Sequence, residues 1–432
     1  MLTDPNPPRP QISPEISPEI EATIPDNWGM NPLLATLQPY PFERLRQLFA
    51  GATPPADRAP ISLGIGEPKH ATPEFIKKAL MASLDTALSG YPATAGELKM
   101  REACAQWLKR RYQVDVNAAT QVLPVNGSRE ALFSLAQAVL NPTQPGGIVI
   151  SPNPFYQIYE GATLLGGAQP YYVANAPENN FSADWDIVPE AIWEKTQLVF
   201  VCSPGNPTGK VMPLAEWQKL FALSEKYGFV IASDECYSEI YFREEPPLGG
   251  LEAASQLGNK DFKRLISFTS LSKRSNVPGL RSGFVAGDAA IIKDFLLYRT
   301  YHGCAMSGVV QAASIAAWND EAHVVENRNL YRTKFAQVTP VLAEVMDVQL
   351  PDASFYLWAG IPAAWGQSDT EFARELYAAE NVTVLPGSYI GRTAQGLNPG
   401  QGRVRMALVA ETEECLEAAH RIARFIKAGR AS

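Results

Sequence analysis

Residues 270–284 read Ser-Leu-Ser-Lys-Arg-Ser-Asn-Val-Pro-Gly-Leu-Arg-Ser-Gly-Phe, directly after a short apolar run. A lysine amine performs covalent carbonyl chemistry only when it is deprotonated, and the neighbouring charges of Arg274 and Arg281 favour a neutral Lys273. The hydroxyl of Ser270 and the guanidinium of Arg281 are groups that bind a phosphate. The alternative is a solvated surface turn, because Ser, Asn, Pro and Gly are turn residues. The remainder of the chain decides between the two interpretations.

Short apolar segments alternate with amphipathic segments from residue 121 onward. Alternation of strands and helices predicts a parallel sheet with helices on both faces. In sheets of this kind, ligands bind at the carboxyl ends of the strands. The expected strands are 121–125, 148–151, 198–203, 229–233, 265–269 and 283–287.

Residues whose side chains can bind ligands or take part in reactions follow four of these strands. The start of a helix after the first strand offers free N–H groups and a positive dipole end that suit an anion. One edge of the sheet is therefore expected to gather an anion site, an amide, a carboxylate, a phenol and a lysine. These residues are, in chain order, Gly127, Ser128, Asn206, Asp234, Tyr237 and Lys273.

Composition and charge are those of a soluble enzyme. The chain has 432 residues, of which 46% are hydrophobic and 19% charged, and its net charge is −8. This acidic balance argues against nucleic-acid binding, which normally requires a basic face. No apolar stretch approaches the ~20 residues that span a bilayer, so we expect no membrane segment. Five dispersed cysteines predict reduced thiols and a cytoplasmic location.

The domain organisation is predicted from changes in pattern along the chain. Residues 1–27 are rich in proline and are expected to form a flexible arm. The repeat of strands and helices assigns residues 61–320 to a large domain. The mixed pattern after it assigns residues 321–432, joined by residues 28–60, to a smaller α+β domain. The four histidines are far apart in the sequence, so we expect no metal site.

Lys273 and Asp234 together meet the requirements of pyridoxal 5′-phosphate (PLP). Enzymes that use PLP hold it through a Schiff base with a lysine and pair its pyridinium nitrogen with an aspartate. Asp234 alone is equally well explained as a helix cap or a turn residue. The two residues at the ends of two strands in one sheet form a much less common pattern, which favours the cofactor site.

From about residue 30 to the C-terminus, the chain resembles the class I/II aminotransferases, which are PLP enzymes of fold type I. The resemblance implies an α/β fold, with a mostly parallel seven-stranded sheet between helices in the large domain and a smaller α+β domain. It also implies a homodimer whose active sites are shared between subunits. The motifs that carry it are Asn206-Pro-Thr-Gly209, Ser233-Asp-Glu-Cys-Tyr237, Ser270-Leu-Ser-Lys273 followed by Arg281, and Val404-Arg405.

The resemblance implies roles for individual residues around the cofactor. Lys273 would form the Schiff base, Asp234 would pair with the pyridinium nitrogen, and Asn206 and Tyr237 would hydrogen-bond the O3′ oxygen. Tyr156 would stack on the ring, with its neighbour Phe155 as the alternative. The phosphate ligands would be Gly127, Ser128, Arg129, Ser270, Arg281 and, across the dimer, Tyr91.

The substrate site is implied in the same way. Arg405 would bind the α-carboxylate of the substrate through a bidentate contact that a lysine makes less well. Gly66 and Asn206 would contribute to the same carboxylate subsite. Arg44, Arg129 and Arg299 are candidates for a distal carboxylate by charge alone, and each is more typical of an ordinary surface arginine.

A narrower resemblance concerns the substrate. Residues 30–34, 38–46 and 272–281 resemble the N-succinyldiaminopimelate aminotransferases of bacterial lysine biosynthesis. This likeness implies ping-pong transfer of an amino group from glutamate to N-succinyl-2-amino-6-oxopimelate, giving N-succinyl-LL-2,6-diaminopimelate and 2-oxoglutarate. Three alternatives remain open: another amino acid and keto acid pair such as aspartate, alanine or an aromatic amino acid, a PLP β-elimination, and a regulatory module that only binds PLP.

Overall fold

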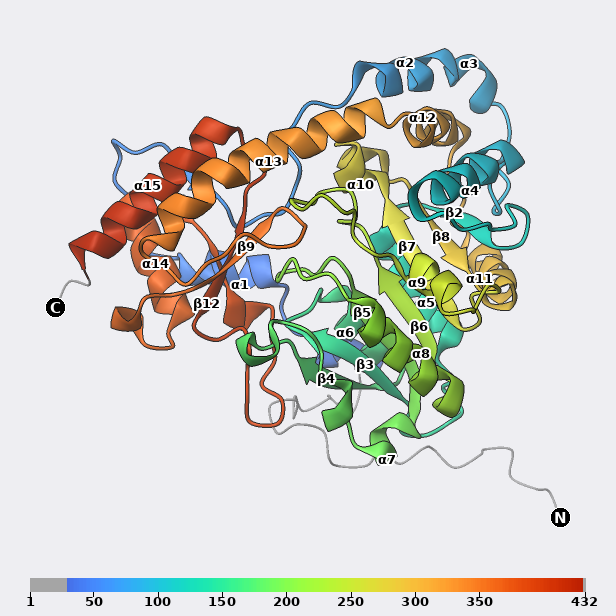
Figure 1. Ribbon diagram of the computed structural model, residues 1–432, viewed down its shortest axis with the longest axis horizontal. Coiled ribbons are helices and arrows are strands. Elements are labelled where there is room, and N and C mark those ends of the chain that lie inside the picture. Colours follow the sequence, from blue (N-terminus) through green and yellow to red (C-terminus); the bar gives the residue numbers. More distant parts are fainter. Residues whose placement is uncertain (1–28, 430–432) are drawn as a thin grey trace.

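A computed structural model describes residues 29–429 of the chain (Figure 1). The arm predicted at residues 1–27 lies outside these described residues. The described chain contains a large sheet covered by helices on both faces, two smaller sheets, and a long helix that runs from one part of the molecule to the other. The exact domain boundaries stay predictions.

Seven strands form the large sheet, in the order β2-β8-β7-β6-β5-β3-β4. Every pair is parallel except the two that involve β8, which is antiparallel to both of its neighbours. The mostly parallel seven-stranded sheet is thus confirmed. The strands are β2 (Val122–Val125), β3 (Ile148–Asn153), β4 (Gln169–Ala174), β5 (Thr196–Cys202), β6 (Val230–Asp234), β7 (Leu265–Ser270) and β8 (Gly283–Gly287).

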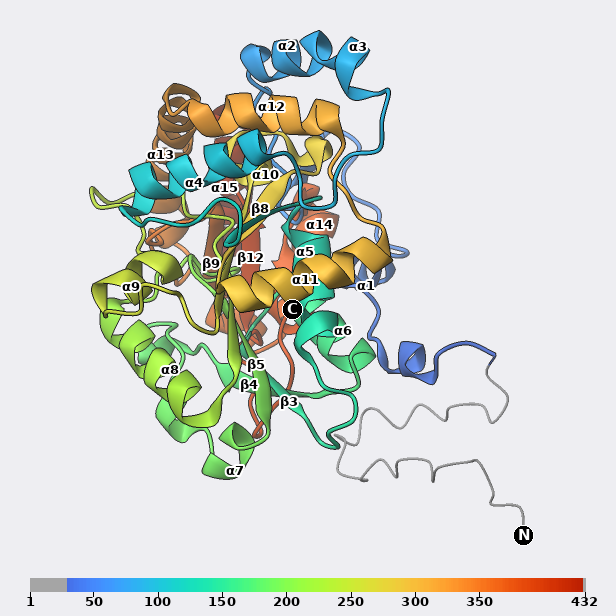
Figure 2. The same ribbon diagram turned by 90° about the vertical axis from the view of Figure 1, so that its right-hand side faces the viewer.

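Each face of the large sheet carries its own hydrophobic core. One core contains Trp107, Trp217 and Trp318, from helices α4, α8 and α12, and the other contains Leu132 and Phe295, from helices α5 and α11. Figure 2 shows α5, α6 and α11 on one side of the sheet and α4, α8 and α9 on the other. The covering helices are α4 (Leu98–Tyr112), α5 (Ser128–Val139), α6 (Ile158–Leu165), α8 (Leu214–Tyr227), α9 (Gly250–Gln256), α11 (Ala289–His302) and α12 (Gly308–Asn319).

The C-terminal part of the chain builds the two smaller sheets. Strands β11, β12 and β9 form an antiparallel sheet in that order, and the short strand β1 pairs in parallel with β10. A separate hydrophobic core fills the space between these sheets and three helices. The elements are β1 (Ile61–Ser62), β9 (Tyr356–Gly360), β10 (Val382–Thr383), β11 (Leu385–Pro386), β12 (Arg403–Ala407), α13 (Ala322–Ala343), α14 (Asp369–Glu380) and α15 (Thr412–Ala428).

Short helices complete the described chain. Helix α1 has Pro41 at its first turn, where the missing N–H costs no hydrogen bond. Helices α2 and α3 follow each other and are separated at Ser83. These elements are α1 (Pro41–Leu48), α2 (Glu74–Ala82), α3 (Leu84–Ala87), α7 (Glu190–Trp193) and α10 (Leu271–Arg274).

Helix α13 connects the large-sheet region to the region of the smaller sheets. It contains 22 residues, begins beside α12 and ends beside α15 (Figure 1). No helix in residues 29–429 has the length and the apolar composition that crossing a membrane would require.

Candidate active site

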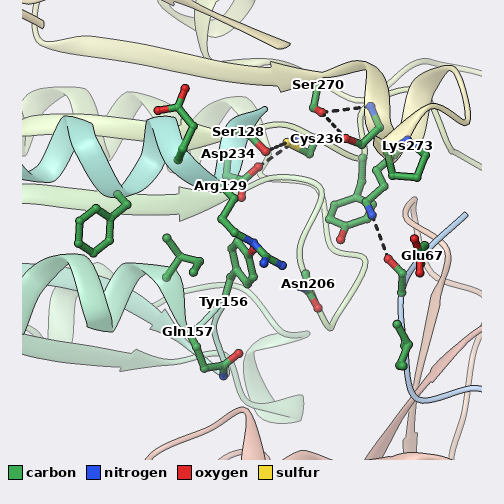
Figure 3. A pocket seen from close by; sticks show the side chains of 18 of the residues that line it. Glu67, Ser128, Arg129, Tyr156, Gln157, Asn206, Asp234, Cys236, Ser270 and Lys273 are labelled. Carbon is green, nitrogen blue, oxygen red and sulfur yellow. Dashed lines mark hydrogen bonds between the residues drawn. The ribbon is translucent and has the colours of Figure 1, made fainter. Parts of the chain in front are cut away.

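A cavity of about 930 Å³ lies at the carboxyl ends of β2, β5, β6 and β7. The two antiparallel contacts of β8 leave β2 parallel to β7, so all four strands end at the same edge. The cavity brings together most of the residues predicted from the sequence (Figure 3). Those that line it are Gly66, Ser128, Arg129, Tyr156, Asn206, Asp234, Tyr237, Ser270, Lys273, Arg281 and Arg405.

Lys273 lies in the single-turn helix α10, directly after β7. The Ser270 hydroxyl caps this turn by accepting a hydrogen bond from the Ser272 N–H at 3.1 Å. The Nζ of Lys273 donates to the main-chain oxygen of Gly66 at 2.9 Å. Burial, with a smaller contribution from the charge of Arg405, lowers the pKa of Lys273 to about 8. The amine is therefore partly neutral near physiological pH.

Arg274 does not act on Lys273 as the sequence predicted. Its guanidinium points away from the cavity, into a buried site between Trp107 and Trp318, where it pairs with Glu321 at 2.7 Å. The side chain is 2% exposed. Its function in the structure is to hold α10 against α12 and the start of α13.

Asp234 ends β6 with its carboxylate buried. The hydroxyl of Tyr159 donates to Oδ2 at 2.8 Å, and the main-chain N–H of Cys236 donates to Oδ1 at 3.3 Å. Burial raises the pKa of Asp234, and these hydrogen bonds oppose the rise. Tyr159 was missed in the sequence, where it is an ordinary apolar position of helix α6.

Arg405 lies on β12 and forms the opposite wall of the cavity. Its Nη1 donates to Asn206 Oδ1 at 3.0 Å, and its Nη2 donates to the main-chain oxygen of Gly64 at 3.0 Å. The guanidinium carbon lies over the ring of Tyr356, at 4.3 Å from the ring centroid. The buried Nε has no hydrogen-bond partner within residues 29–429, so one donor of this fixed fork remains available.

The phenol of Tyr356 also connects two predicted residues. Its hydroxyl is 3.2 Å from the hydroxyl of Tyr237. A Cβ added at Gly66 would collide with the same hydroxyl, so the close approach of this loop requires glycine. Tyr356 was also missed, because it precedes Arg405 by 49 positions and no local pattern links the two.

The anion site predicted at the start of α5 is assembled from three segments. Gly127 has φ +86°, and a Cβ there would meet the guanidinium of Arg281. Ser128 begins α5, and the hydroxyl of Ser270 donates to Ser272 Oγ at 2.9 Å on the facing segment. The helix start, the hydroxyls and the guanidinium form a cradle whose donors suit a phosphate.

Of the two adjacent aromatic residues, Tyr156 lines the cavity and Phe155 does not. Arg129 donates from Nε to the Tyr156 hydroxyl at 2.6 Å. Phe155 is buried in the core, with its ring stacked on Tyr172 at 5.0 Å between centroids. The structure therefore favours Tyr156 over Phe155 as the aromatic side chain of the site.

Three predicted residues lie elsewhere. Tyr91 is fully exposed and does not line the cavity. Arg44 is stacked on Tyr389, with its guanidinium carbon 4.0 Å from the ring centroid. The expectation of a surface position for Arg299 is wrong, because its side chain is completely buried and pairs with Glu130 at 2.8 Å. Arg299 is thereby excluded as a ligand of a distal carboxylate.

The family of the chain follows from its match to a known sequence profile. The profile of "Aminotransferase class I and II" matches residues 58–422, which include all of the predicted residues that line the cavity. The chain is a class I/II aminotransferase. Members of this family use PLP, and the large parallel sheet with its smaller partner is the fold of type I PLP enzymes.

Individual relatives agree with the family. An LL-diaminopimelate aminotransferase of Nitratidesulfovibrio vulgaris is 33% identical over 91% of this chain and 98% of its own length. The crystal structure of an aminotransferase from Neisseria meningitidis Z2491 is 55% identical, covers 92% of this chain and all of its own, and has a TM-score of 0.89. A structure from Thermus thermophilus, described as a probable N-succinyldiaminopimelate aminotransferase, is 26% identical over 89% of this chain and 100% of its own, with a TM-score of 0.78.

Proposed function

We propose that this aminotransferase transfers the amino group of glutamate to the keto carbon of N-succinyl-2-amino-6-oxopimelate, with release of 2-oxoglutarate. The observation that carries the proposal is the pairing of Arg405 with Asn206 on one wall of the cavity and the separate guanidinium of Arg129 on another. Two separated cations suit a substrate that has a carboxylate at each end. The cavity, at about 930 Å³, is near the upper end of the range for small-molecule sites, which leaves room for a cofactor and a long substrate.

The residues around the cavity fit PLP. The cradle at α5 suits the phosphate, Asp234 suits the pyridine nitrogen, and the ring face of Tyr156 suits an aromatic ring. When bound, PLP supplies an electron-withdrawing ring that stabilises negative charge at the substrate α-carbon. The proposed cofactor ligands are Gly127, Ser128, Arg129 (through its main-chain N–H), Tyr156, Asn206, Asp234, Tyr237, Ser270, Lys273 and Arg281, with Tyr91 from a second subunit.

Lys273 is the proposed catalytic residue, as both the covalent anchor and the proton carrier. Its pKa of about 8 allows the same amine to take a proton from the substrate α-carbon and to return it later. Arg405 and the main chain at Gly66 would hold the α-carboxylate, which fixes the C–H bond toward Nζ. Asn206 and Tyr237 would orient the cofactor, and Asp234 would keep its charge beside the ring nitrogen.

The distal end of the substrate is assigned to Arg129. Its Nε is engaged by Tyr156, and it has no carboxylate partner in the described part of the chain, so its terminal nitrogens are free to bind an anion. Glu67 also lines the cavity and is exposed. A carboxylate at this position would favour a free ammonium group, as found on a substrate without the succinyl group.

Direct amination toward LL-diaminopimelate is therefore the second candidate. Curated relatives with 31–34% identity are named LL-diaminopimelate aminotransferases, and the Glu67 carboxylate supports it. The two candidates differ only at the distal nitrogen, which is an amide in one substrate and an amine in the other. The sequence resemblance and the room in the cavity support the succinylated form.

Steady-state kinetics with glutamate separates the candidates. We expect kcat/KM for the succinylated keto acid to exceed that for its unsuccinylated counterpart and for oxaloacetate, pyruvate and phenylpyruvate by about 100-fold, the scale of a substrate group missing from a pocket that accommodates it. Arg129→Ala should reduce the preference over pyruvate and phenylpyruvate, which lack a distal carboxylate, and Arg129→Lys should preserve part of it. A preference for the unsuccinylated substrate would support the second candidate, and equal efficiency on all acceptors would contradict both.

A homodimer with shared sites is also proposed. Tyr91 and Leu88, on the loop after α3, and Leu297 and Tyr301, on α11, are large apolar side chains that are more than half exposed. Large exposed apolar side chains that gather on one surface typically mark a protein interface, and these four are proposed to lie at the dimer contact. In mixed dimers of Tyr91→Phe and Lys273→Ala subunits, one site would carry both defects and the other neither. Recovery of about half of one wild-type dimer's activity is expected, whereas a monomeric active enzyme would contradict the proposal.

A further inference from the structure

Buried polar side chains connect helix α13 to the main chain of Lys273. Asn327 and Lys334 are seven residues apart on α13, which is two helical turns and places them on one face. Asn327 Nδ2 donates to the main-chain oxygen of Lys273 at 3.3 Å, and its Oδ1 is 2.9 Å from His70 Nδ1. The Nζ of Lys334 is 3.0 Å from His70 Nε2. The exposed fractions are 4% for Asn327, 8% for His70 and 1% for Lys334.

The chemistry of the partners fixes the direction of each hydrogen bond. The ammonium of Lys334 only donates, so His70 Nε2 accepts and the proton of the imidazole is on Nδ1. His70 Nδ1–H and Asn276 Nδ2–H both donate to Asn327 Oδ1. The amide nitrogen of Asn327 is thereby oriented toward Lys273. The other His70 tautomer, or a reversed Asn327 amide, would leave a buried donor facing a donor.

The loop that carries His70 also contacts the reactive end of Lys273. Gly66, four positions before His70, accepts the hydrogen bond from Lys273 Nζ at 2.9 Å. Thr72, two positions after it, donates from Oγ1 to the main-chain oxygen of Asn276 at 2.8 Å. Lys273 is therefore held at its backbone by Asn327 and at its amine by the loop that His70 anchors.

We propose that Asn327, His70 and Lys334 are positioning residues that fix Lys273 relative to the cofactor and couple its position to helix α13. The proposal rests on the role proposed above for Lys273. Neither α13 nor these three side chains touch the substrate cavity, so their effect on the reaction acts through Lys273 and the loop at Gly66. A displacement of the reactive amine by about 1 Å costs on the order of 100-fold in rate, so a remote contact can control turnover.

Asn327→Asp is the most specific variant. The carboxylate keeps two acceptors for His70 and Asn276 but has no N–H for the main-chain oxygen of Lys273. Lys334→Met removes the ammonium at the far end while it keeps the length of the side chain. Tyr331→Phe is the matched control, because Tyr331 is on the same helix with its ring centroid 4.7 Å from that of His70, and its buried hydroxyl has no partner among residues 29–429.

The measurements are made on the enzyme with PLP bound. We expect Asn327→Asp to lower kcat about tenfold and to leave KM for glutamate within about twofold, because substrate binding is untouched while Nζ is displaced. The visible circular dichroism of the bound cofactor should fall at the same time, because it reports the asymmetry that Lys273 imposes. Lys334→Met should give the same changes on a smaller scale of about threefold, and Tyr331→Phe should leave both quantities unchanged.

A wild-type dichroism band and wild-type kcat in Asn327→Asp would overturn the proposal. So would a change that Tyr331→Phe reproduces, because it would indicate a general loss of packing. If Asn327→Asp does not fold, Lys334→Met provides the same readouts. Lys273→Ala tests the proposed role of Lys273 separately. If that variant still binds PLP covalently, the role of Lys273 is wrong. If it loses the covalent bond while Asn327→Asp has wild-type kcat and dichroism, only the positioning proposal is refuted.

Discussion

Lys273 and Lys334 both have largely buried side chains, and neither has a carboxylate within ion-pair distance among the described residues. Lys273 is half-buried on α10, and Lys334 is 1% exposed on α13. Burial lowers the pKa of both amines below the ordinary value of 10.5. By this property alone, either could be the reactive amine of an aminotransferase.

What separates them is what each amine faces. The Nζ of Lys273 opens into the cavity, near the Asp234 carboxylate and the Arg405 guanidinium, and its hydrogen-bond partner is a main-chain oxygen. The Nζ of Lys334 faces the His70 imidazole and does not line this cavity. A lowered pKa therefore identifies a catalytic lysine only when the amine also has access to a substrate.

Of the changes that test the difference between the two lysines, replacement of Lys273 should have the largest effect on activity. Lys273→Ala is expected to lower kcat by at least about 1000-fold, because it removes both the covalent anchor and the proton carrier. Borohydride reduction followed by peptide mass spectrometry should find the cofactor on Lys273 in the wild-type enzyme and on no lysine in the variant. Lys334→Met is the control and should keep the label on Lys273; a label on Lys334 would reverse the assignment.

The loop that contacts Lys273 should give the next largest effect. A methyl group at Gly66 collides with the Tyr356 hydroxyl, so Gly66→Ala displaces the carbonyl that accepts from Nζ. We expect kcat/KM for glutamate to fall about 100-fold, the usual cost of a displacement near 1 Å. Gly279→Ala is the matched control, because Gly279 also lines the cavity and a Cβ there has no atom within 4 Å. Equal loss in both variants would exclude the steric mechanism.

The contrast between the two lysines also indicates what sequence analysis can recover. The residues at the ends of β2, β5, β6 and β7 were predicted because the relevant signal is local: an apolar strand followed at once by a residue with useful chemistry. Lys273 and Asp234 belong to this group. Arg405 was identified only through its resemblance to a family motif, since β12 lies in a different sheet.

The missed features depend on contacts between distant positions. Strand β4 was not predicted, because it is an edge strand that contains Pro170 and is only partly buried. The Tyr159 hydroxyl reaches a carboxylate 75 positions away, and Lys334 reaches an imidazole 264 positions away. In the sequence Lys334 is one charged position of a long helical run, and only the fold reveals that it is buried.

The pH dependence of cofactor attachment should distinguish the two amines. Only a neutral amine attacks the PLP aldehyde, so the attachment rate of the apoenzyme should rise about tenfold per pH unit in the acidic range and level off as Lys273 loses its proton. The expected midpoint is about pH 8. Stopped-flow absorbance between about pH 6 and pH 10 measures this profile. Lys334→Met should give the same midpoint, and a rate that still rises about tenfold between pH 9 and pH 10 would contradict the lowered pKa of Lys273.

The smallest expected effect concerns the stability contributed by Lys334. Because its pKa is lower in the folded chain than in the unfolded chain, the protonated amine opposes folding, and this penalty is relieved as the pH rises toward 10.5. Lys334→Met should therefore raise the thermal unfolding midpoint at about pH 7. The free energy of unfolding should increase by about 1 kcal/mol, which is the net gain after the loss of the hydrogen bond to His70 is subtracted. The gain should shrink near about pH 10.

The titratable groups around Lys334 allow the pH dependence of the stability gain to be attributed to the titration of Lys334 itself. Burial lowers the pKa of His70, so the imidazole is neutral throughout, and burial raises the pKa of the Cys415 thiol to about 11. Glu411 and Glu414 raise the pKa of the Lys334 amine through their charges, and Lys69 lowers it. A gain in stability that does not change with pH would contradict the lowered pKa of Lys334. Higher stability combined with lower kcat would mark Lys334 as a residue retained for positioning.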